Sequence, residues 1–168
     1  MLRTERLVLR PWRVTDAAFQ HLLWSERDPR VPAHRRLSPD GHPTVAELGE
    51  RLRRYRQEPC PGLLVIERED GGGAIGYCGL VASQLGDADE PELAYELRRS
   101  AHGQGHATEA GAAVVGLARE LGHRSLASTV RAWNGPSLRV LDRLGFSDTG
   151  ERIEDAAHGD TLVLRKVL

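Results

Sequence analysis

The feature that most constrains this chain is a glycine-containing turn that joins a strand-like run to a long amphipathic run. Residues 92–97 have the length and alternation of a strand, and residues 107–121 repeat apolar side chains at helical spacing; residues 102–108, HGQGHAT, connect them. Gly103 and Gly105 let the backbone approach a ligand closely, and the first turn of the following helix leaves N–H groups without intrahelical partners. The turn is therefore either an ordinary strand-to-helix connection or a cradle for an anion such as phosphate.

A second strand, loop and helix come directly after the first unit. Residues 125–132 form a strand-like run, residues 133–137 read WNGPS, and a helical run over 138–144 stops at Gly145 and Phe146. Two such units in series make the anion cradle a stronger interpretation than either unit would alone.

Length and composition favour one domain over residues 1–168. A chain of 168 residues with 40% hydrophobic content can bury a core without disulfides or metals, and no metal site is expected because Cys60 and Cys78 lack ligand spacing. The formal net charge of −1, without a basic block, disfavours nucleic acid as a partner. No apolar run approaches the roughly 20 residues that span a bilayer, so we expect no membrane partner and a cytoplasmic protein.

The remaining pattern predicts an α+β arrangement rather than a doubly wound one. Thr15 and Asp16 offer an N-cap for a first helix, Thr44 begins a second helix with capping-box spacing, and residues 28–43 are expected to be loop. An apolar stripe of Ala107, Ala110, Val114, Leu117 and Leu121 marks the third helix, with Gly122 after its end. The expected strands are residues 7–9, 63–66, 74–81, 92–97, 125–132, 149–153 and 161–167.

Together these segments resemble the GNAT superfamily of acyl-CoA-dependent N-acetyltransferases. The superfamily's cofactor loop has the form Q/R-x-x-G-x-G/A, and its next unit reads N-x-x-S/A before a helix that ends L-G-F. The opening LRTERLVLRP at residues 2–11 and the pair Ile75-Gly76 are similar to the ribosomal-protein branch, typified by RimJ and RimL. The resemblance implies a mixed, mostly antiparallel sheet of seven strands with about four helices, splayed between the strands at 92–97 and 125–132.

The resemblance also implies acetyl-CoA as co-substrate, with its pantetheine arm in the split and its pyrophosphate on the glycine loop. His102 stands where many members carry Gln or Arg, and the alternative for His102 and His106 is that they are exposed loop histidines. The residues expected to bind the cofactor are Leu97, Arg98, His102, Gly103, Gln104, Gly105, His106, Ala107, Thr108 and Asn134.

Two carboxylates are candidates for the base that takes a proton from the attacking amine. Glu92 occupies the position where many members place this glutamate, and Glu96 shares its strand parity. Strand alternation puts both opposite the apolar face of Leu93, Tyr95 and Leu97, so one of the two carboxylates is expected to border the acceptor cleft. The alternative is that both face solvent.

The hydroxyl expected near the departing thiolate is that of Ser137. Many members use a tyrosine seven residues after the motif asparagine, but that position is Leu141 here. Ser137 matches a serine suggested for this role in the ribosomal-protein branch, and its alternative is a capping role at the helix start. Asn134 either caps the same helix or anchors pantetheine, and Trp133 is expected to be core or cleft wall.

We therefore expect an N-acetyltransferase that moves an acetyl group from acetyl-CoA directly to a primary amine, on a protein N-terminus, peptide or small molecule. The alternative is a non-catalytic acyl-CoA-binding or regulatory protein of the same fold. Acceptor identity is expected to lie in loops 28–43, 84–90 and 153–160, where the sequence pattern is uninformative. The oligomeric state, including a homodimer, stays open.

Overall fold

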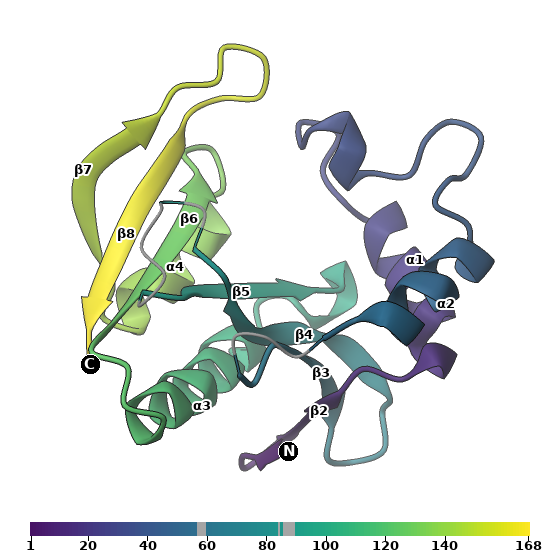
Figure 1. Cartoon of the computed structure of the whole chain (residues 1–168), viewed down its shortest axis with the longest axis horizontal. Helices are drawn as coiled ribbons and strands as arrows, with labels where there is room; N and C mark the ends of the chain where they lie inside the picture. The colour runs from purple at the N-terminus through teal and green to yellow at the C-terminus, as the bar shows by residue number, and fades with distance from the viewer. Residues whose placement is uncertain (57–59, 84, 86–89) are drawn as a thin grey trace.

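The computed structural model describes residues 1–56, 60–83, 85 and 90–168 (Figure 1). Most of the turn expected at 86–90 therefore lies outside the described residues. The strands are β1 (Leu2–Arg3), β2 (Leu7–Pro11), β3 (Leu63–Arg68), β4 (Ala74–Val81), β5 (Glu92–Leu97), β6 (Ser125–Arg131), β7 (Ser147–Ile153) and β8 (Thr161–Val167). The helices are α1 (Ala17–Ser25), α2 (Val45–Arg54), α3 (His106–Glu120) and α4 (Gly135–Arg143), with short 3-10 turns at Val14–Asp16, Ala33–Arg35 and Arg99–Ala101.

Over the described residues the strands form one sheet in the order β1-β2-β3-β4-β5-β6-β8-β7. Every neighbouring pair is antiparallel except β5 and β6, which run parallel and share the single register pair Glu92 with Ala127. The expected α+β class and the splay between these two strands are confirmed. The described sheet has eight strands rather than seven, because Leu2 and Arg3 add a short edge strand against β2.

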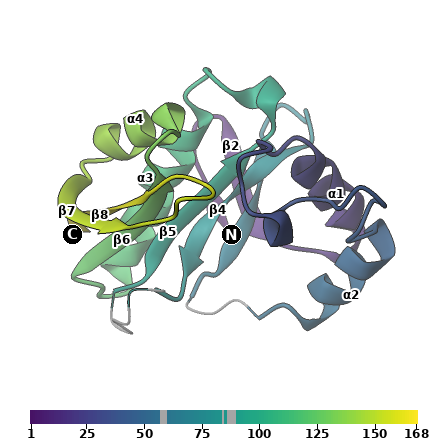
Figure 2. The ribbon, with the colours of Figure 1, turned by 90° about the horizontal axis from the view of Figure 1, so that it is seen from above.

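The helices divide between two parts of the sheet. Helix α3 packs across β2, β4 and β5 and contacts α4, whereas α1 and α2 pack against each other away from α3 (Figure 2). Gly111 of α3 permits the contact with α4, since a Cβ there would lie 2.6 Å from a methyl carbon of Leu144. The C-terminal end of α4 is thereby held against α3.

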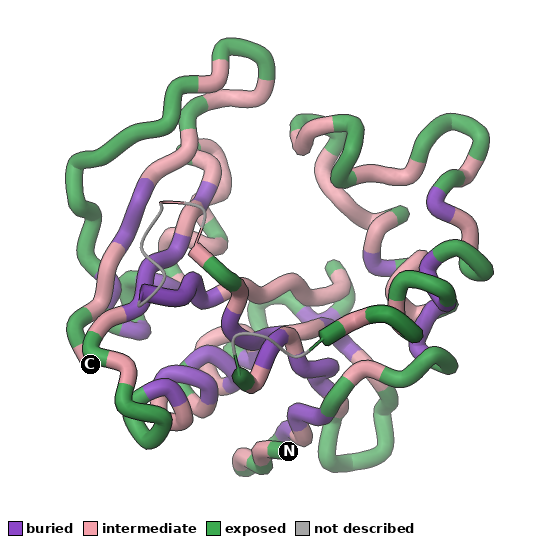
Figure 3. The backbone as a smooth tube through the Cα atoms, in the orientation of Figure 1, coloured by how far each residue is buried: buried purple, intermediate pink, exposed green. Residues whose placement is uncertain are grey.

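The core lies between α3 and the central strands, where the buried segments gather in Figure 3. The predicted stripe on α3 is correct at Ala110 and Val114, which are fully buried, but Leu121 is 45% exposed. Val115 and Ala118 are buried in its place, which shows that the buried face is rotated slightly from the predicted one. Gly122 has a φ of 86° directly after the helix C-cap, as its predicted place after the helix end requires.

The expected N-cap position is confirmed, since Asp16 is the N-cap residue of α1, but the expected capping bond from its side chain is not made. Thr15 and Asp16 belong to the 3-10 turn before α1. Asp16 is buried and accepts hydrogen bonds from both terminal nitrogens of Arg10 at 2.8 Å and from the Arg13 N–H at 2.7 Å. A buried arginine on β2 requires a compensating charge, and that need takes the carboxylate away from the helix.

Candidate active site

A cavity of about 700 Å³ lies where the end of β5, the start of α3 and the start of α4 meet. Its wall continues over the segment after α1 and over Trp133. The two strand-loop-helix units predicted from the sequence therefore line one cavity together.

The glycine turn forms the floor of this cavity at the N-terminus of α3. Gly103 and Gly105 have φ values of 75° and 81°, which side chains rarely adopt, and Gly105 is the N-cap residue. His106 is only 6% exposed, and its Nδ1 has no hydrogen-bond partner among the described residues; the buried Thr108 Oγ1 has none either. Two buried polar atoms without partners beside free helix N–H groups fit a phosphate-bearing ligand.

Hydrogen bonds and an ion pair link the glycine cradle and the first turn of α3 to the N-terminal segment of the chain. Glu109, in the first turn of α3, accepts hydrogen bonds from Thr4 Oγ1 at 2.6 Å, the Arg6 N–H at 2.9 Å and Arg6 Nε at 2.7 Å. Arg6 Nη1 also donates to the Gln104 carbonyl oxygen at 3.0 Å. Burial raises the pKa of Glu109, but the hydrogen bonds from Thr4 and Arg6 outweigh it and hold that pKa below its usual value. Sequence reasoning missed this contact because it joins residues more than 100 positions apart.

Most of the predicted cofactor residues line the cavity. They are Leu97, His102, Gly103, Gly105, His106, Ala107, Thr108 and Asn134.

Arg98 and Gln104 are not among the described lining residues. The Arg98 side chain pairs with Glu26 at 3.3 Å, and Gln104 Nε2 donates to the Ser100 carbonyl at 2.9 Å. His106 is buried rather than an exposed loop histidine, whereas His102 is exposed and places its Nε2 2.9 Å from the Leu97 carbonyl oxygen.

One edge of β5 is left open toward the cavity. The Arg98 N–H donates to Ile75 on β4 at 2.8 Å, so strand alternation turns the backbone groups of Leu97 and Tyr95 the other way. Beyond Glu92 the described part of β6 supplies no register partner for that edge. An extended chain with amide groups, such as pantetheine, fits such an edge.

The two candidate bases occupy different environments. Glu92 is 5% exposed, accepts a hydrogen bond from Thr129 Oγ1 at 2.9 Å, and is not among the described lining residues. Glu96 lines the cavity, where both of its oxygens are bonded by Arg27, at 2.8 and 2.5 Å, and Tyr77 donates to it at 2.9 Å. Burial and the charge of Glu96 raise the pKa of Tyr77.

Ser137 and Asn134 both line the cavity at the start of α4, and the capping role belongs to Asn134. Asn134 is the N-cap residue, and its side chain accepts from the Ser137 N–H at 3.3 Å. The Ser137 hydroxyl lies 2.7 Å from the phenol oxygen of Tyr95 on β5. Leu141, at the position of the usual tyrosine, is fully buried in the core.

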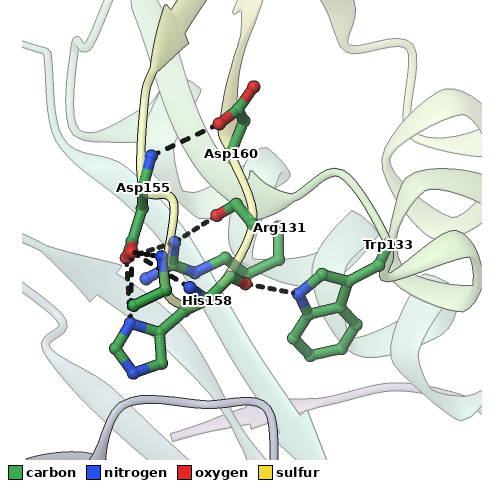
Figure 4. Close-up of polar contacts among 7 residues, drawn as sticks. Arg131, Trp133, Asp155, His158 and Asp160 are labelled. Atoms are coloured by element: carbon green, nitrogen blue, oxygen red, sulfur yellow. Dashed lines mark hydrogen bonds and ion pairs between the residues drawn. The ribbon is translucent and has the colours of Figure 1, made fainter.

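Arg30 and Trp133 both line one end of the cavity, and the segment after α1 and the β7–β8 hairpin rise above the sheet on either side (Figure 1). Arg30, from the segment after α1, lies 4.0 Å over the ring of Trp133 and pairs with Asp28. The β7–β8 hairpin supports Trp133 from the other side, since Trp133 Nε1 donates to the His158 carbonyl at 2.8 Å (Figure 4). Trp133 is therefore cleft wall, as predicted.

The hairpin tip is itself fixed to β6. Arg131 Nη1 donates to Asp155 at 2.9 Å and to the Gly159 carbonyl at 2.5 Å, and the Asp155 N–H donates to Asp160 at 3.3 Å (Figure 4). These bonds hold one of the loops in which acceptor identity was predicted to lie.

The described residues contain no cluster of three or more His, Cys, Asp or Glu side chains arranged to hold a metal ion. None of their helices combines the length and hydropathy needed to cross a membrane.

Solved structures with this fold include an acetyltransferase (GNAT family) from Bacillus anthracis, with a TM-score of 0.79 at 17% identity, covering 99% of this chain and 97% of that one. An acetyltransferase from Agrobacterium tumefaciens str. C58 has a TM-score of 0.70 at 26% identity, covering 99% and 94%. Mycobacterium smegmatis RimJ, solved in complex with CoA-disulfide, has a TM-score of 0.73 at 24% identity, covering 96% and 81%. No curated protein matches the sequence.

The sequence itself gives the family. The profile of the Acetyltransferase (GNAT) domain matches residues 6–147, which include the fastening residue Arg6, the glycine cradle and the Asn134 unit. The chain therefore belongs to the GNAT acetyltransferase family.

Proposed function

We propose that this protein transfers the acetyl group of acetyl-CoA directly to the primary amine of a small molecule or a peptide N-terminus. Acetyltransferases of this family use acetyl-CoA as the acetyl donor. The observation that carries the proposal is the pair of unpartnered buried atoms, His106 Nδ1 and Thr108 Oγ1, at the N-terminus of α3. They lie in the same cavity as the open edge of β5, so one site offers both an anion cradle and a strand edge.

The cysteines support direct transfer without an acyl-enzyme intermediate. Cys78 is fully buried in the core, and burial raises the pKa of its thiol to about 12, which disfavours the nucleophilic thiolate. Cys60 is exposed and is not among the described residues that line the cavity. Free thiols at both positions also agree with a cytoplasmic location.

Acetyl-CoA supplies the thioester whose carbonyl carbon the amine attacks. We assign proton acceptance from the incoming ammonium to Glu96, through a bridging water, because Glu96 is the candidate base that lines the cavity. Arg27 and Tyr77 fix the orientation of its carboxylate. Ser137, at the other side of the opening, donates a hydrogen bond to the sulfur as the C–S bond breaks. Glu92, the other carboxylate expected from the sequence, is the alternative base that the matched variants below test.

The function is tested by following CoA thiol release from acetyl-CoA with a panel of amines, which includes an alanine-ended peptide and several small monoamines. Turnover with at least one amine supports the enzyme. Calorimetric binding of acetyl-CoA without turnover on any amine would instead support a non-catalytic acyl-CoA-binding protein.

Two variants locate the donor site. Gly105→Val places a branched side chain at a φ of 81° in the cradle and should abolish acetyl-CoA binding. Gly116→Val, within α3 where an added Cβ meets no atom within 4 Å, should bind normally. Unchanged affinity in a folded Gly105→Val protein would place the phosphate site elsewhere.

The base is tested by two matched variants. Glu96→Gln should lower kcat/KM by roughly 10²–10⁴ at neutral pH with little change in acetyl-CoA affinity, as expected for the loss of a general base. Glu92→Gln keeps an acceptor for Thr129 and should retain most activity. A large loss in the Glu92 variant beside full activity in the Glu96 variant would transfer the role to Glu92.

A further inference from the structure

Tyr95 on β5 contacts the serine proposed to face the thiolate, which lies on α4 at the other side of the split. Its phenol oxygen lies 2.7 Å from Ser137 Oγ and 3.0 Å from the Ser137 carbonyl oxygen. Both residues line the cavity. The sequence placed Tyr95 only on the apolar side of its strand, so this contact was not expected.

The two partners are held from opposite sides of the split. Tyr95 is paired with Cys78 in the continuous β4–β5 ladder, and Ser137 stands in the first turn of α4 behind the Asn134 cap. The Tyr95 contact lies beyond Glu92, the residue at which the described parts of β5 and β6 share their single register pair. The positions of both hydroxyls are therefore fixed by regular elements rather than by a loop.

The Tyr95 phenol has two acceptors within reach, the Ser137 carbonyl oxygen at 3.0 Å and Ser137 Oγ at 2.7 Å, and we take the shorter contact as the one that receives its proton. The Ser137 carbonyl lies in the first turn of a helix, where carbonyls accept from the N–H four residues on, whereas Ser137 Oγ has no other hydrogen-bond partner among the described residues. The distance to Oγ is also the one usual for O–H···O bonds. Burial raises the pKa of Tyr95 to about 12, so its phenol keeps its proton at neutral pH and can donate.

We propose that Tyr95 is a positioning residue that donates its phenol proton to Ser137 Oγ and thereby leaves the Ser137 hydroxyl hydrogen free to face the departing sulfur. This inference rests on the proposed function. As the neutral amine nitrogen bonds to the acetyl carbon, the C–S bond breaks and its electron pair stays on sulfur, where the Ser137 hydroxyl donates. The surplus proton on nitrogen passes to the departing thiolate, which yields the amide and the CoA thiol. No proton leaves Tyr95. In this chain Leu141 is buried in the core and cannot donate to the sulfur, so the donor is Ser137, which a tyrosine from β5 orients.

The kinetic test is a double-variant cycle. Ser137→Ala should lower kcat by about tenfold to a hundredfold, as expected for loss of one donor to developing charge. Tyr95→Phe, which removes only the hydroxyl, should lower kcat several-fold and leave the KM for acetyl-CoA nearly unchanged. In the Ser137→Ala background, Tyr95→Phe should have no further effect, because it acts through Ser137.

The control is Tyr55→Phe. Tyr55 also uses its phenol oxygen in a hydrogen bond, which it accepts from the Leu63 N–H at 2.6 Å, but it is not among the residues that line the cavity. This variant should lower the melting temperature without lowering kcat. A change of kcat confined to Tyr95→Phe therefore separates positioning from a general loss of stability.

A binding readout does not depend on turnover. If Ser137 donates to sulfur, the wild-type protein should bind free CoA more tightly as the pH rises through the ionisation of the CoA thiol. Calorimetry from pH 7 to 9.5 should show a weaker rise in both Tyr95→Phe and Ser137→Ala, with equal acetyl-CoA affinity in all three proteins.

The outcomes separate the two proposals. No wild-type turnover with any amine would refute the proposed function, and the CoA titration alone would then decide the role of Tyr95. With wild-type turnover established, unchanged kcat in Tyr95→Phe, or the same loss with and without Ser137, would show that Tyr95 is only a structural tie.

Discussion

Replacing Glu109 with alanine should release both the N-terminal segment and the cofactor cradle. The substitution removes the acceptor for Thr4 Oγ1, the Arg6 N–H and Arg6 Nε, the first two of which are neutral donors to a charged group. Such bonds contribute about 1.5–3 kcal/mol each. The Arg6 side chain is 47% exposed, so its ion pair adds only about 0–1 kcal/mol.

Water can reach part of this cluster, since the Glu109 side chain is itself 18% exposed. After that discount we expect a loss of about 2–4 kcal/mol of unfolding free energy, because water replaces part of each lost bond. For a chain of this size that loss lowers Tm by roughly 5–15 °C, measurable by calorimetry or circular dichroism. Arg6 also holds the Gln104 carbonyl, so the dissociation constant for acetyl-CoA should rise about tenfold, or about 1.4 kcal/mol.

Glu120→Ala is the matched control, because Glu120 is an exposed carboxylate on the same helix. It should leave both Tm and affinity near the wild-type values. A Glu109→Ala protein that melts within 1 °C of wild type would refute the fastening role. A lowered Tm with unchanged acetyl-CoA affinity would refute the coupling between Arg6 and the cradle.

Two further outcomes are expected. Burial raises the pKa of Tyr95 from 10.0, and that of Cys78 from 9.0, to about 12. Their contribution to the unfolding free energy is therefore complete below about pH 9 and is lost as the pH rises through 12. Denaturant midpoints measured across that range should fall with rising pH, and less steeply in Cys78→Ala. Asp28 and Glu96, two carboxylates that line the cavity, are each paired with an arginine, so their charges are not available to bind extra ammonium groups. A polycation such as spermidine should therefore give a lower kcat/KM than a monoamine of similar length. Spermidine as the best amine of the panel would contradict that charge argument.

Local pattern was sufficient for most of the fold. Each of the seven predicted strands is present, and the α3 stripe was identified at Ala110 and Val114. Apolar runs between polar turns mark most of these strands, whereas β7 is exposed along its whole length. The short strand β1 was missed because two residues carry no periodicity. Asp16 was placed correctly as the N-cap residue of α1, but its side chain pairs with the buried Arg10, a partner set by tertiary packing rather than by helix-capping preference.

In the site, too, the local features could be predicted from the sequence and the long-range contacts could not. The cradle could be predicted because its glycines and helix start are adjacent in sequence. The contacts of Tyr95 with Ser137 and of Arg27 with Glu96 join residues 42 and 69 positions apart, and no local pattern encodes such a distance. Parity assigned Tyr95 to the apolar side of its strand, but the split between β5 and β6 gives that side access to the cavity as well.

Because β5 and β6 share a single register pair among the described residues, the two parts of the sheet can separate locally along these strands. Strands β1 to β5 form one continuous ladder and β6, β8 and β7 form another, so the seam can widen without breaking either ladder. The amides of Tyr95 and Leu97, which face that seam, should exchange with deuterated solvent through small local openings. Amides hydrogen-bonded inside the two ladders should exchange more slowly, because they require larger unfolding events. A bound donor lying along the seam would slow exchange at these two positions first, so their protection would report occupancy independently of turnover.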